Sequence, residues 1–372
     1  MKIVIAPDSF KESLPAELVA KAIHEGFIES FPDAEYHLLP IGDGGEGTMQ
    51  SLASANQAVI ETVSVTGPLS EPVHAKIAFS SDGKKAYIEM AEASGLHLVP
   101  FERRNPLNAT TFGVGELIVH AMDSGATELV IGVGGSATND GGIGMAAALG
   151  YRFYDHEGAL VRGIGQDLFH IESMTGEHRD PRLDKVKITI AADVENPLTG
   201  SNGATYVYGP QKGLKKEMLE EVDSALGRFY EKACSNFNKE IMSIPGSGAG
   251  GGIAAGLLLF TNAEIKKGIE LVLEELDVKN ICKDADLVIV GEGRMDGQTL
   301  NGKAPLGVAA CSPASSRVIA ICGSIGDGSE KLYKHGIHAV FPTIPALLPV
   351  ERIMNDAYNN IKRTARNIAA LL

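Results

Sequence analysis

Residues 129–149 read LVIGVGGSATNDGGIGMAAAL, and this stretch decides the fold. An aliphatic run typical of a buried strand, 129–133, is followed by a glycine-rich polar loop and then by an alanine-rich helical segment. The same succession begins again at Ile3, Asp286 and Val318. Strands that alternate with helices favour parallel sheets covered on both faces. The sequence therefore predicts an α/β protein.

Residues 61–99 follow a different pattern. Three runs there alternate apolar and polar residues, and the Asp-Gly pair at 82–83 is a turn signal between two of them. Such hairpin-linked strands predict a second domain inserted into the first. We expect the first domain to comprise residues 1–62 and 285–372, and the inserted α/β domain to comprise residues 63–284.

The composition is that of an acidic, glycine-rich globular chain, with 47 Asp and Glu residues against 33 Lys and Arg and a formal net charge of −14. Such a surface repels phosphate backbones and anionic lipids, which disfavours nucleic acids and membranes as partners. The four cysteines lack metal-ligand spacing, and the longest apolar run, 253–260, is too short to span a bilayer. The N-terminus enters a strand without a signal-peptide pattern. We expect a cytoplasmic enzyme, either a monomer or a homo-oligomer.

In parallel α/β sheets, ligands bind beyond the carboxyl ends of the strands. The first loop in such a place is 7–13, where a helix start offers free N–H groups to an anion and Lys11 adds a positive charge. We take Lys11, Asp8 and Ser9 as substrate-binding candidates. The alternative is that Asp8 and Ser13 only cap the turn and the helix, and the sequence fits both interpretations.

The second loop, 42–48, reads GDGGEGT. Its glycines let the backbone approach a ligand closely, and we take Gly44 and Gly45 as nucleotide-binding candidates. Asp43 and Glu46 offer the carboxylate oxygens that Mg²⁺ prefers. Which of the two carboxylates acts stays open.

The third loop, 132–142, resembles a backbone nest that binds phosphate. Its glycine spacing is not that of the dinucleotide fingerprint. A close strand-to-helix crossing would explain the glycines but not the cluster of polar residues beside them. The nucleotide-binding candidates from this loop are Gly134, Gly135, Ser136, Thr138 and Asn139. Asp140 is a candidate ligand of Mg²⁺.

The fourth loop, 246–252, fits G-x-G-x-x-G, which is a weak match alone. Pro245 precedes it, and the strand expected before a dinucleotide motif is not convincing. An anion site at the start of the following helix remains reasonable. We add Gly248 and Gly250 to the nucleotide-binding candidates.

The fifth loop, 291–305, contains a G-x-x-x-x-G-K match that ends at Lys303. Ala304 follows where a P-loop needs a hydroxyl group, so we reject a P-loop. Arg294, Asp296 and Lys303 together indicate instead a clamp for a charged substrate beside a carboxylate base or metal ligand.

Six ordered stretches together resemble the type-1 glycerate kinase family. They are KIVIAPDSFKESL at 2–14, GDGGEGT at 42–48, GGSATNDGG at 134–142, ADVENPLTG at 192–200, GPQKG at 209–213 and GEGRMDGQTLNGK at 291–303. They run through the whole chain in order, and as a set they are highly specific. Small departures, such as Ala192, Glu195 and Gly297, are conservative.

The resemblance implies phosphorylation of D-glycerate with ATP and Mg²⁺, at the 2-hydroxyl rather than the 3-hydroxyl. It also implies a flavodoxin- or Rossmann-like parallel-sheet domain built from both chain ends, with a different α/β domain inserted into it. The active site would be the cleft between the two.

Phosphoryl transfer requires positioning and charge neutralisation from the protein. We expect Arg294, or in second place Lys11, to bind the glycerate carboxylate. Asp296 is the first candidate to accept the hydroxyl proton and Asp193 the second, and Lys303 joins them as a catalytic residue. The sequence does not separate the loops that hold ATP from those that hold glycerate.

Two other functions compete with this one. An NAD-dependent oxidoreductase of small hydroxy acids would explain the glycine-rich loops, but it needs a strand, a G-x-G-x-x-G turn and a helix with a downstream acid. A non-catalytic protein that binds small anions would explain a cleft, but such proteins usually carry an export signal.

Overall fold

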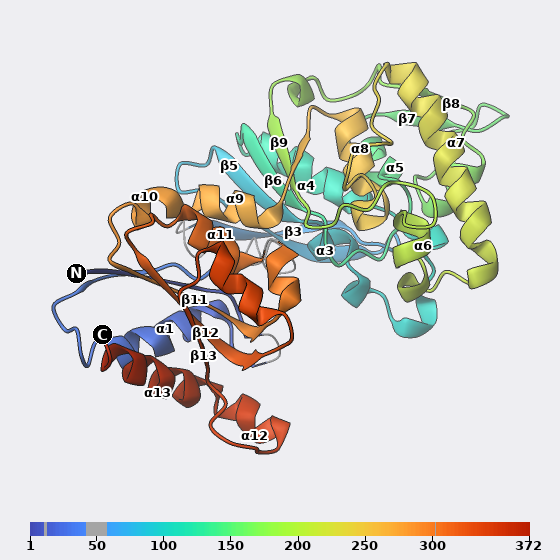
Figure 1. Cartoon of the computed structure of the whole chain (residues 1–372). Helices are drawn as coiled ribbons and strands as arrows, with labels where there is room; N and C mark the ends of the chain where they lie inside the picture. The colour runs from blue at the N-terminus through green and yellow to red at the C-terminus, as the bar shows by residue number, and fades with distance from the viewer. Residues whose placement is uncertain (11–12, 42–57, 302) are drawn as a thin grey trace. The chain divides into compact units, whose positions relative to one another are not determined.

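The computed structural model describes residues 1–10, 13–41, 58–301 and 303–372. The backbone divides into two compact units, one made of Met1–Gly44 with Ile269–Leu372 and the other of Gly45–Gly268. Each unit has its own sheet of parallel or mixed strands, and the first contains both chain ends (Figure 1). The predicted α/β class is confirmed.

The first unit is built on a five-stranded sheet in the order β13-β12-β11-β1-β2, in which all neighbours run parallel. The strands are β1 (Lys2–Pro7), β2 (Glu35–Leu38), β11 (Leu287–Met295), β12 (Arg317–Ile325) and β13 (Ala339–Pro342). In chain order within the unit this is the flavodoxin-like arrangement 2-1-3-4-5. Its strand order reverses between β1 and β11, and ligands bind in such sheets beyond the carboxyl ends of the strands at the reversal.

Helices cover both faces of this sheet. On one face α1 (Ala16–Phe27) and α13 (Ala357–Ala369) pack against each other and share a core with Ile3 and Ile5 of β1 (Figure 1). Side chains alternate along a strand, so the buried Val4 faces the other side, where α11 (Ala304–Cys311) contacts β1 and β11. The remaining helices of this unit are α9 (Gly268–Glu275), α10 (Val278–Cys282) and α12 (Val350–Asn355).

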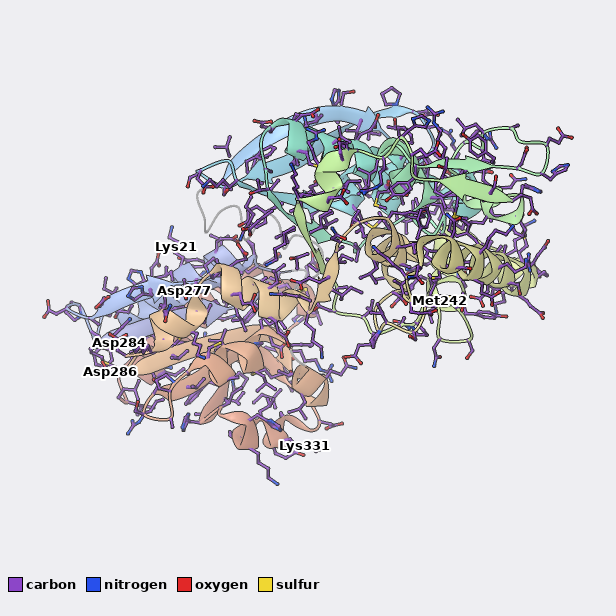
Figure 2. The ribbon with its side chains drawn as sticks, turned by 90° about the horizontal axis from the view of Figure 1, so that it is seen from above. Lys21, Met242, Asp277, Asp284, Asp286 and Lys331 are labelled. Atoms are coloured by element: carbon purple, nitrogen blue, oxygen red, sulfur yellow. The ribbon has the colours of Figure 1, made fainter. Side chains whose placement is uncertain are left out.

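Charged residues join β1 to β11 at the amino ends of the strands. Figure 2 shows Asp284 and Asp286 together just before β11. The Lys2 N–H donates to Asp286 Oδ2 at 2.7 Å, and Lys2 Nζ donates to Asp284 Oδ1 at 2.5 Å. Because these contacts lie at the end opposite the carboxyl edge, we assign them a structural role.

The second unit contains a six-stranded mixed sheet in the order β10-β9-β6-β5-β4-β3. Its strands are β3 (Val59–Thr66), β4 (Pro72–Phe79), β5 (Lys85–Glu89), β6 (Glu128–Gly132), β9 (Lys187–Ala191) and β10 (Glu264–Lys266); β7 (Arg152–Tyr154) and β8 (Ser173–Thr175) form a separate pair. The predicted hairpin strands are present, since β3, β4 and β5 pair antiparallel. β5 also pairs parallel with β6, and β6, β9 and β10 continue the parallel part, so the carboxyl ends of these four strands form one row.

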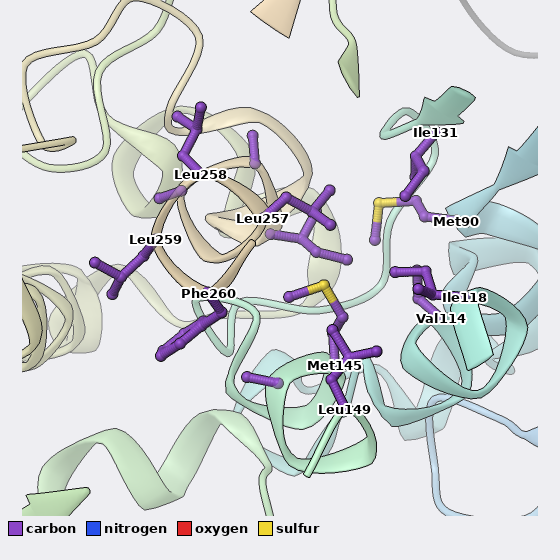
Figure 3. Packing of buried hydrophobic residues seen from close by; sticks show 14 of the residues in the cluster. Met90, Val114, Ile118, Ile131, Met145, Leu149, Leu257, Leu258, Leu259 and Phe260 are labelled. Atoms are coloured by element: carbon purple, nitrogen blue, oxygen red, sulfur yellow. The ribbon is translucent and has the colours of Figure 1, made fainter. Parts of the chain in front are cut away.

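The core of the second unit lies between this sheet and its helices. These are α3 (Met90–Ser94), α4 (Phe112–Asp123), α5 (Ile143–Ala148), α6 (Ala204–Tyr208), α7 (Leu219–Phe237) and α8 (Ile253–Phe260). Figure 3 shows Val114 and Ile118 of α4, Met145 of α5 and Leu257 of α8 gathered in this core. Every residue of α8 is buried, which explains why the apolar run at 253–260 has no polar face.

The division between the units differs from the expected boundary at 284/285. It falls at 268/269, because Ile269 and Leu273 of α9 pack against Gly307 of α11 and α10 also contacts α11. The helices that precede β11 therefore belong with the first unit.

Within the described part of the chain, none of the helices combines the length and the apolar character needed to cross a lipid bilayer. The location of the protein in the cell stays a prediction.

Candidate active site

The carboxyl end of β1 holds two of the predicted substrate-binding residues. Asp8 is buried, and its backbone N–H donates to the carbonyl oxygen of Gly291 in β11 at 2.8 Å. The Ser9 N–H donates to Asp8 Oδ1 at 2.5 Å, so the carboxylate turns back onto its own chain. Ser13, the alternative helix cap, donates its hydroxyl to the Met354 carbonyl instead. Asp8 and Ser9 thus lie where the strand order reverses.

The neighbouring strand β11 is longer than the sequence predicted. We expected a strand at 286–290 and a loop from Gly291, but β11 continues to Met295 because it keeps its pairing with β12 to that residue. The extension carries Glu292 and Arg294 out to the carboxyl edge of the sheet. The prediction that Gly291 to Gly293 form a loop is therefore wrong.

The structure brings Arg294 and Asp296 together. Arg294 Nε lies 3.1 Å from Asp296 Oδ2, with side chains that are 67% and 19% exposed. The Gln298 N–H donates to Asp296 Oδ1 at 2.9 Å, and the Asp296 N–H donates to Thr299 Oγ1 at 3.1 Å. These contacts fix the direction of the carboxylate while leaving the guanidinium largely accessible.

Glu292 is a residue that the sequence analysis did not select. Its side chain is buried, and its Oε2 lies 3.2 Å from Lys303 Nζ at the start of α11. The Thr299 hydroxyl donates to Glu292 Oε1. Burial raises the pKa of the Glu292 carboxyl, and the Thr299 hydroxyl and the Lys303 ammonium oppose this rise. The signal in the sequence was a carboxylate two residues after the apolar run 287–290 and two residues before Arg294.

In the second unit, the loops that follow the parallel strands also meet at one edge. The last residues of β5, β6, β9 and β10 lie in register. The loop 134–142 follows β6, and Asp193 follows β9. This edge of the second unit therefore holds its own cluster of predicted residues.

Asp140 has a structural role at this edge. Its fully buried carboxylate accepts hydrogen bonds from the Thr111 N–H at 2.8 Å, the Thr111 hydroxyl at 2.7 Å, the Gly142 N–H at 3.0 Å and the Gly144 N–H at 3.3 Å. Burial raises the pKa of this carboxyl, and these donors oppose the rise. Because both oxygens already hold the loop together, the geometry argues against the metal-ligand role predicted for Asp140.

The polar residues of the loop meet a lysine that the sequence analysis did not select. Lys212 is 2% exposed, and its Nζ donates to Ser136 Oγ and to the Thr138 carbonyl, each at 2.7 Å. Burial lowers its pKa to about 7, and Asp140 opposes this shift. The short helix η6 (Pro210–Lys212) carries it, and its signal was the GPQKG motif.

Gly134 and Gly135 are exposed, Ser136 is buried at 7% exposure, and Thr138 and Asn139 are fully buried. Asn139 Nδ2 donates to Thr205 Oγ1 at 3.1 Å. Thr138 Oγ1 and Asn139 Oδ1 have no hydrogen-bond partner among the described residues. The side chains of Thr138 and Asn139 therefore do not reach a ligand in this geometry, and the accessible part of the loop is its beginning.

Gly248 and Gly250 meet protein atoms rather than open space. A Cβ on Gly248 would lie 2.2 Å from the Pro197 carbonyl oxygen, and Gly250 has a φ of +64°. Residues 241–244, which precede this segment, are not in a strand. The glycines thus serve close packing of the backbone, which argues against their predicted role in nucleotide binding and against an NAD motif here.

Asp193 is exposed, and its Oδ1 accepts a hydrogen bond from the Gly268 N–H at the start of α9 at 2.8 Å. This contact is what a cap would make, and the catalytic role of Asp193 stays a prediction. Five further candidates lie outside the described residues, so their predicted roles stay predictions: Lys11, Asp43, Gly44, Gly45 and Glu46.

No group of three or more His, Cys, Asp or Glu side chains is arranged to hold a metal ion in the described ranges, which omit 42–57. A metal bound by these residues would need other oxygen ligands, such as the phosphates of a nucleotide.

Comparison with known proteins covers the whole chain. A sequence model of the glycerate kinase family matches residues 3–372. The chain is 50% identical to a glycerate kinase of Bacillus subtilis (strain 168) over 100% of this chain and 97% of that one. It is 47% identical to a glycerate 2-kinase of Escherichia coli (strain K12), over 100% of this chain and 98% of that one.

A solved structure from Salmonella typhimurium LT2 that carries the name glycerate kinase 2 superposes with a TM-score of 0.90 at 46% identity, covering 100% of this chain and 98% of that one. Both the sequence and the fold therefore lead to the same assignment. The chain belongs to the glycerate kinase family, and it is a kinase, a phosphotransferase whose acceptor is an alcohol group.

Proposed function

We propose that the chain transfers the terminal phosphoryl group of Mg²⁺-bound ATP to the 2-hydroxyl group of D-glycerate. The observation that carries this proposal is the Arg294–Asp296 pair at the carboxyl end of β11, beside the reversal of strand order. A hydroxy acid needs a cation for its carboxylate and an acceptor for its hydroxyl proton. This pair offers one of each.

Arg294 is the proposed site for the glycerate carboxylate. Its planar guanidinium can donate two parallel hydrogen bonds to a carboxylate, and its side chain is largely exposed. Lys11 remains the second candidate for this role, and Asp8 and Ser9 lie at the end of the adjacent strand.

Asp296 is the proposed base. As the glycerate hydroxyl oxygen attacks the terminal phosphorus, the bond from that phosphorus to the bridging oxygen breaks and ADP leaves, while Asp296 accepts the hydroxyl proton. The Gln298 N–H holds the carboxylate in place for this step. Asp193 stays the second candidate.

Lys303 is the proposed partner of the transferred phosphoryl group. Glu292 holds the Lys303 ammonium at the start of α11, and Thr299 in turn donates to Glu292. An ammonium fixed in this way can stabilise negative charge that develops on phosphate oxygens. Glu292 then acts as a positioning residue.

The loop that begins at Gly134 is the proposed site for ATP phosphates. Lys212, as an ammonium, only donates hydrogen bonds, so Ser136 Oγ accepts from it. The hydroxyl hydrogen of Ser136 must then point elsewhere, and it can serve an anionic ligand. Gly134 and Gly135 leave their backbone accessible beside it.

Mg²⁺ binds oxygen ligands and commonly uses one or two carboxylates together with substrate phosphates. In the first unit Asp8 and Asp296 have oxygens of this kind, and in the second unit Asp193 has them. Asp43 and Glu46 stay candidates outside the described residues. When bound, the ion would neutralise charge on the phosphates of ATP.

The 2-hydroxyl is favoured because the Escherichia coli relative is named a glycerate 2-kinase. ³¹P NMR of a reaction with ATP, MgCl₂ and D-glycerate tests the proposal. We expect ADP and 2-phosphoglycerate in equal amounts. 3-Phosphoglycerate would correct the position, and the absence of any phosphoglycerate would reject the activity.

A further inference from the structure

The second unit contains a cavity that none of the roles above uses. It has a volume of about 650 Å³ and is lined by the turn at 102–105, by Asn108 and by the segment 213–215. This volume is in the range of pockets that bind small metabolites. The cavity lies entirely within the second unit, so its walls are defined without reference to the first.

The walls of the cavity are positively charged. Arg103, Arg104 and Lys215 line it, against one carboxylate, Glu102. Arg103 also pairs with Glu71 outside the lining, at 2.9 Å. Such a concentration of cations is notable on a chain with a formal net charge of −14, because the rest of the surface repels anions. The local charge selects for an anionic ligand.

Arg104 supplies an unused hydrogen-bond donor. Its Nε is buried and has no partner among the described residues. Its Cζ lies 5.4 Å from the centroid of the Phe101 ring, which is 77% exposed. A buried guanidinium N–H without an acceptor is unfavourable. Arg104 also lines the cavity, and a guanidinium can donate strong, charge-assisted hydrogen bonds to an oxyanion there.

Another wall of the cavity is apolar. Leu107 and Leu214 line it, and both belong to a small cluster with Val222. A ligand that fits both walls has an anionic group and an apolar or aromatic body. Free inorganic ions satisfy only the first of these requirements.

The cavity is also adjacent in the chain to the lysine that holds the proposed phosphate loop. Gly213 follows Lys212 directly, and its backbone has a φ of +92°. A Cβ there would lie 2.2 Å from the Arg104 carbonyl oxygen, so the turn sits directly on the backbone of Arg104. A ligand against Arg104 would therefore contact the same turn that carries Lys212.

We propose that this cavity is a binding site for a phosphate-bearing small molecule, with a phosphate group against Arg104 and Lys215 and its body on Leu107 and Leu214. Two sources share this chemistry. One is the adenine nucleotide of the kinase reaction, an assignment that rests on the proposed function. The other is a phosphorylated hydroxy acid that binds separately from the reaction.

Isothermal titration calorimetry on the full chain tests the proposal with three probes: inorganic pyrophosphate, ADP and 2-phosphoglycerate. The variants are Arg104→Gln and Lys215→Gln. Because Lys215 is exposed, we expect its change to leave the fold intact. The matched control is Lys216→Gln, an exposed neighbour that does not line the cavity. We expect both cavity variants to weaken at least one probe by about tenfold, since each loses a charged donor, and the control to stay within twofold.

The pattern of losses identifies the ligand. Weaker ADP binding with a raised KM for ATP assigns the cavity to the nucleotide, whereas weaker binding of 2-phosphoglycerate alone assigns it to a separate effector or product. Unchanged binding of all three probes in both cavity variants would overturn the proposal. Calorimetry does not require turnover, so a chain without glycerate kinase activity would still give a readable result with pyrophosphate.

Discussion

Lys212 is a buried lysine that has no carboxylate at hydrogen-bond distance among the residues that the structure describes, and this makes it unusual. Its Nζ contacts are a hydroxyl and a carbonyl oxygen, and its pKa is lowered to about 7 by burial. Neutral acceptors stabilise an ammonium less than a carboxylate does, so the folded protein disfavours the charged form of this lysine. Such an arrangement is typical of a functional site.

Stability should depend on pH through Lys212. An unfolded lysine has a pKa near 10.5, so between pH 7 and about 10.5 the unfolded chain binds a proton that the folded chain does not. The group therefore makes folding more favourable as pH rises, by up to about 1.4 kcal/mol per pH unit. Lys212→Met removes this contribution. The free energy of unfolding should therefore increase more between pH 7 and pH 10 for the wild type than for the variant.

Urea unfolding followed by far-ultraviolet circular dichroism measures this difference, since the chain has no Trp for fluorescence. Lys216→Met, at an exposed position, is the control and should track the wild type. Parallel stability curves for Lys212→Met and the wild type would show that Lys212 is not perturbed.

Glu292 gives a second prediction at the level of single residues. In Glu292→Gln the amide can still accept from Thr299, but its NH₂ group would face the Lys303 ammonium, donor against donor. We expect Lys303 to move and kcat/KM to fall by about tenfold to a hundredfold, because misplacement of one charged group weakens transition-state contacts. Steady-state kinetics test this prediction, with Glu330→Gln at an exposed position as the control. Equal kcat/KM values for the two variants would show that Glu292 does not position Lys303.

Some of these residues could be identified from the sequence and others could not, for a physical reason. Arg294 and Asp296 stand in a polar, glycine-rich stretch, where charged side chains are conspicuous. Glu292 stands in the same glycine-rich stretch and Lys212 in the GPQKG motif, and the burial of both depends on tertiary packing, which leaves no local signal. Asp140 is conspicuous in the sequence, but the hydrogen bonds that argue against its predicted metal role come from Thr111, a residue 29 positions away.

At the scale of elements, the glycine-rich loops divide into two kinds. Gly248 meets the backbone of Pro197, whereas a Cβ on Gly134 would meet nothing within 4 Å. From sequence alone both were candidates for ligand approach. Only the crossing of distant segments distinguishes a glycine that makes room for the protein from one that leaves room for a ligand.

The pair Gly248→Ala and Gly134→Ala tests this division. We expect Gly248→Ala to lose roughly 1–3 kcal/mol of stability, because backbone must move to admit the methyl group. Gly134→Ala should change stability by less than about 0.5 kcal/mol but raise the KM for ATP, because the methyl group lies where phosphate approaches. Thermal unfolding and steady-state kinetics of both variants measure these effects. A loss of stability in Gly134→Ala and a raised KM for ATP in Gly248→Ala would contradict this division.

Strand length is another property that the local pattern could not give. The continuous apolar runs of β11 and β12 stop before Gly291 and Gly323, yet the strands continue to Met295 and Ile325 respectively. Their mutual pairing extends them, and it places Arg294 opposite Ser324. The position of the Arg294–Asp296 pair thus depends on a contact between two strands.

At the scale of the whole molecule, the repeated strand–loop–helix pattern was sufficient for the fold class. It was also sufficient to place the polar loops at the carboxyl ends of strands, since parallel pairing aligns those ends. From its place in the chain, the segment between β10 and β11 was assigned to the inserted domain. It packs in the first unit instead, because Ile269 and Leu273 fit against α11. Long-range packing of this kind leaves no local signal.

The central claim is that Asp296 accepts the proton of the glycerate hydroxyl during phosphoryl transfer. The most direct measurement is kcat for Asp296→Asn with ATP, MgCl₂ and D-glycerate, beside Asp33→Asn at an exposed position before β2. We predict that kcat of Asp296→Asn falls by at least about a hundredfold, with unchanged thermal stability and ATP binding, because an amide cannot take up the proton. A folded Asp296→Asn variant with a kcat near that of the wild type would contradict the account.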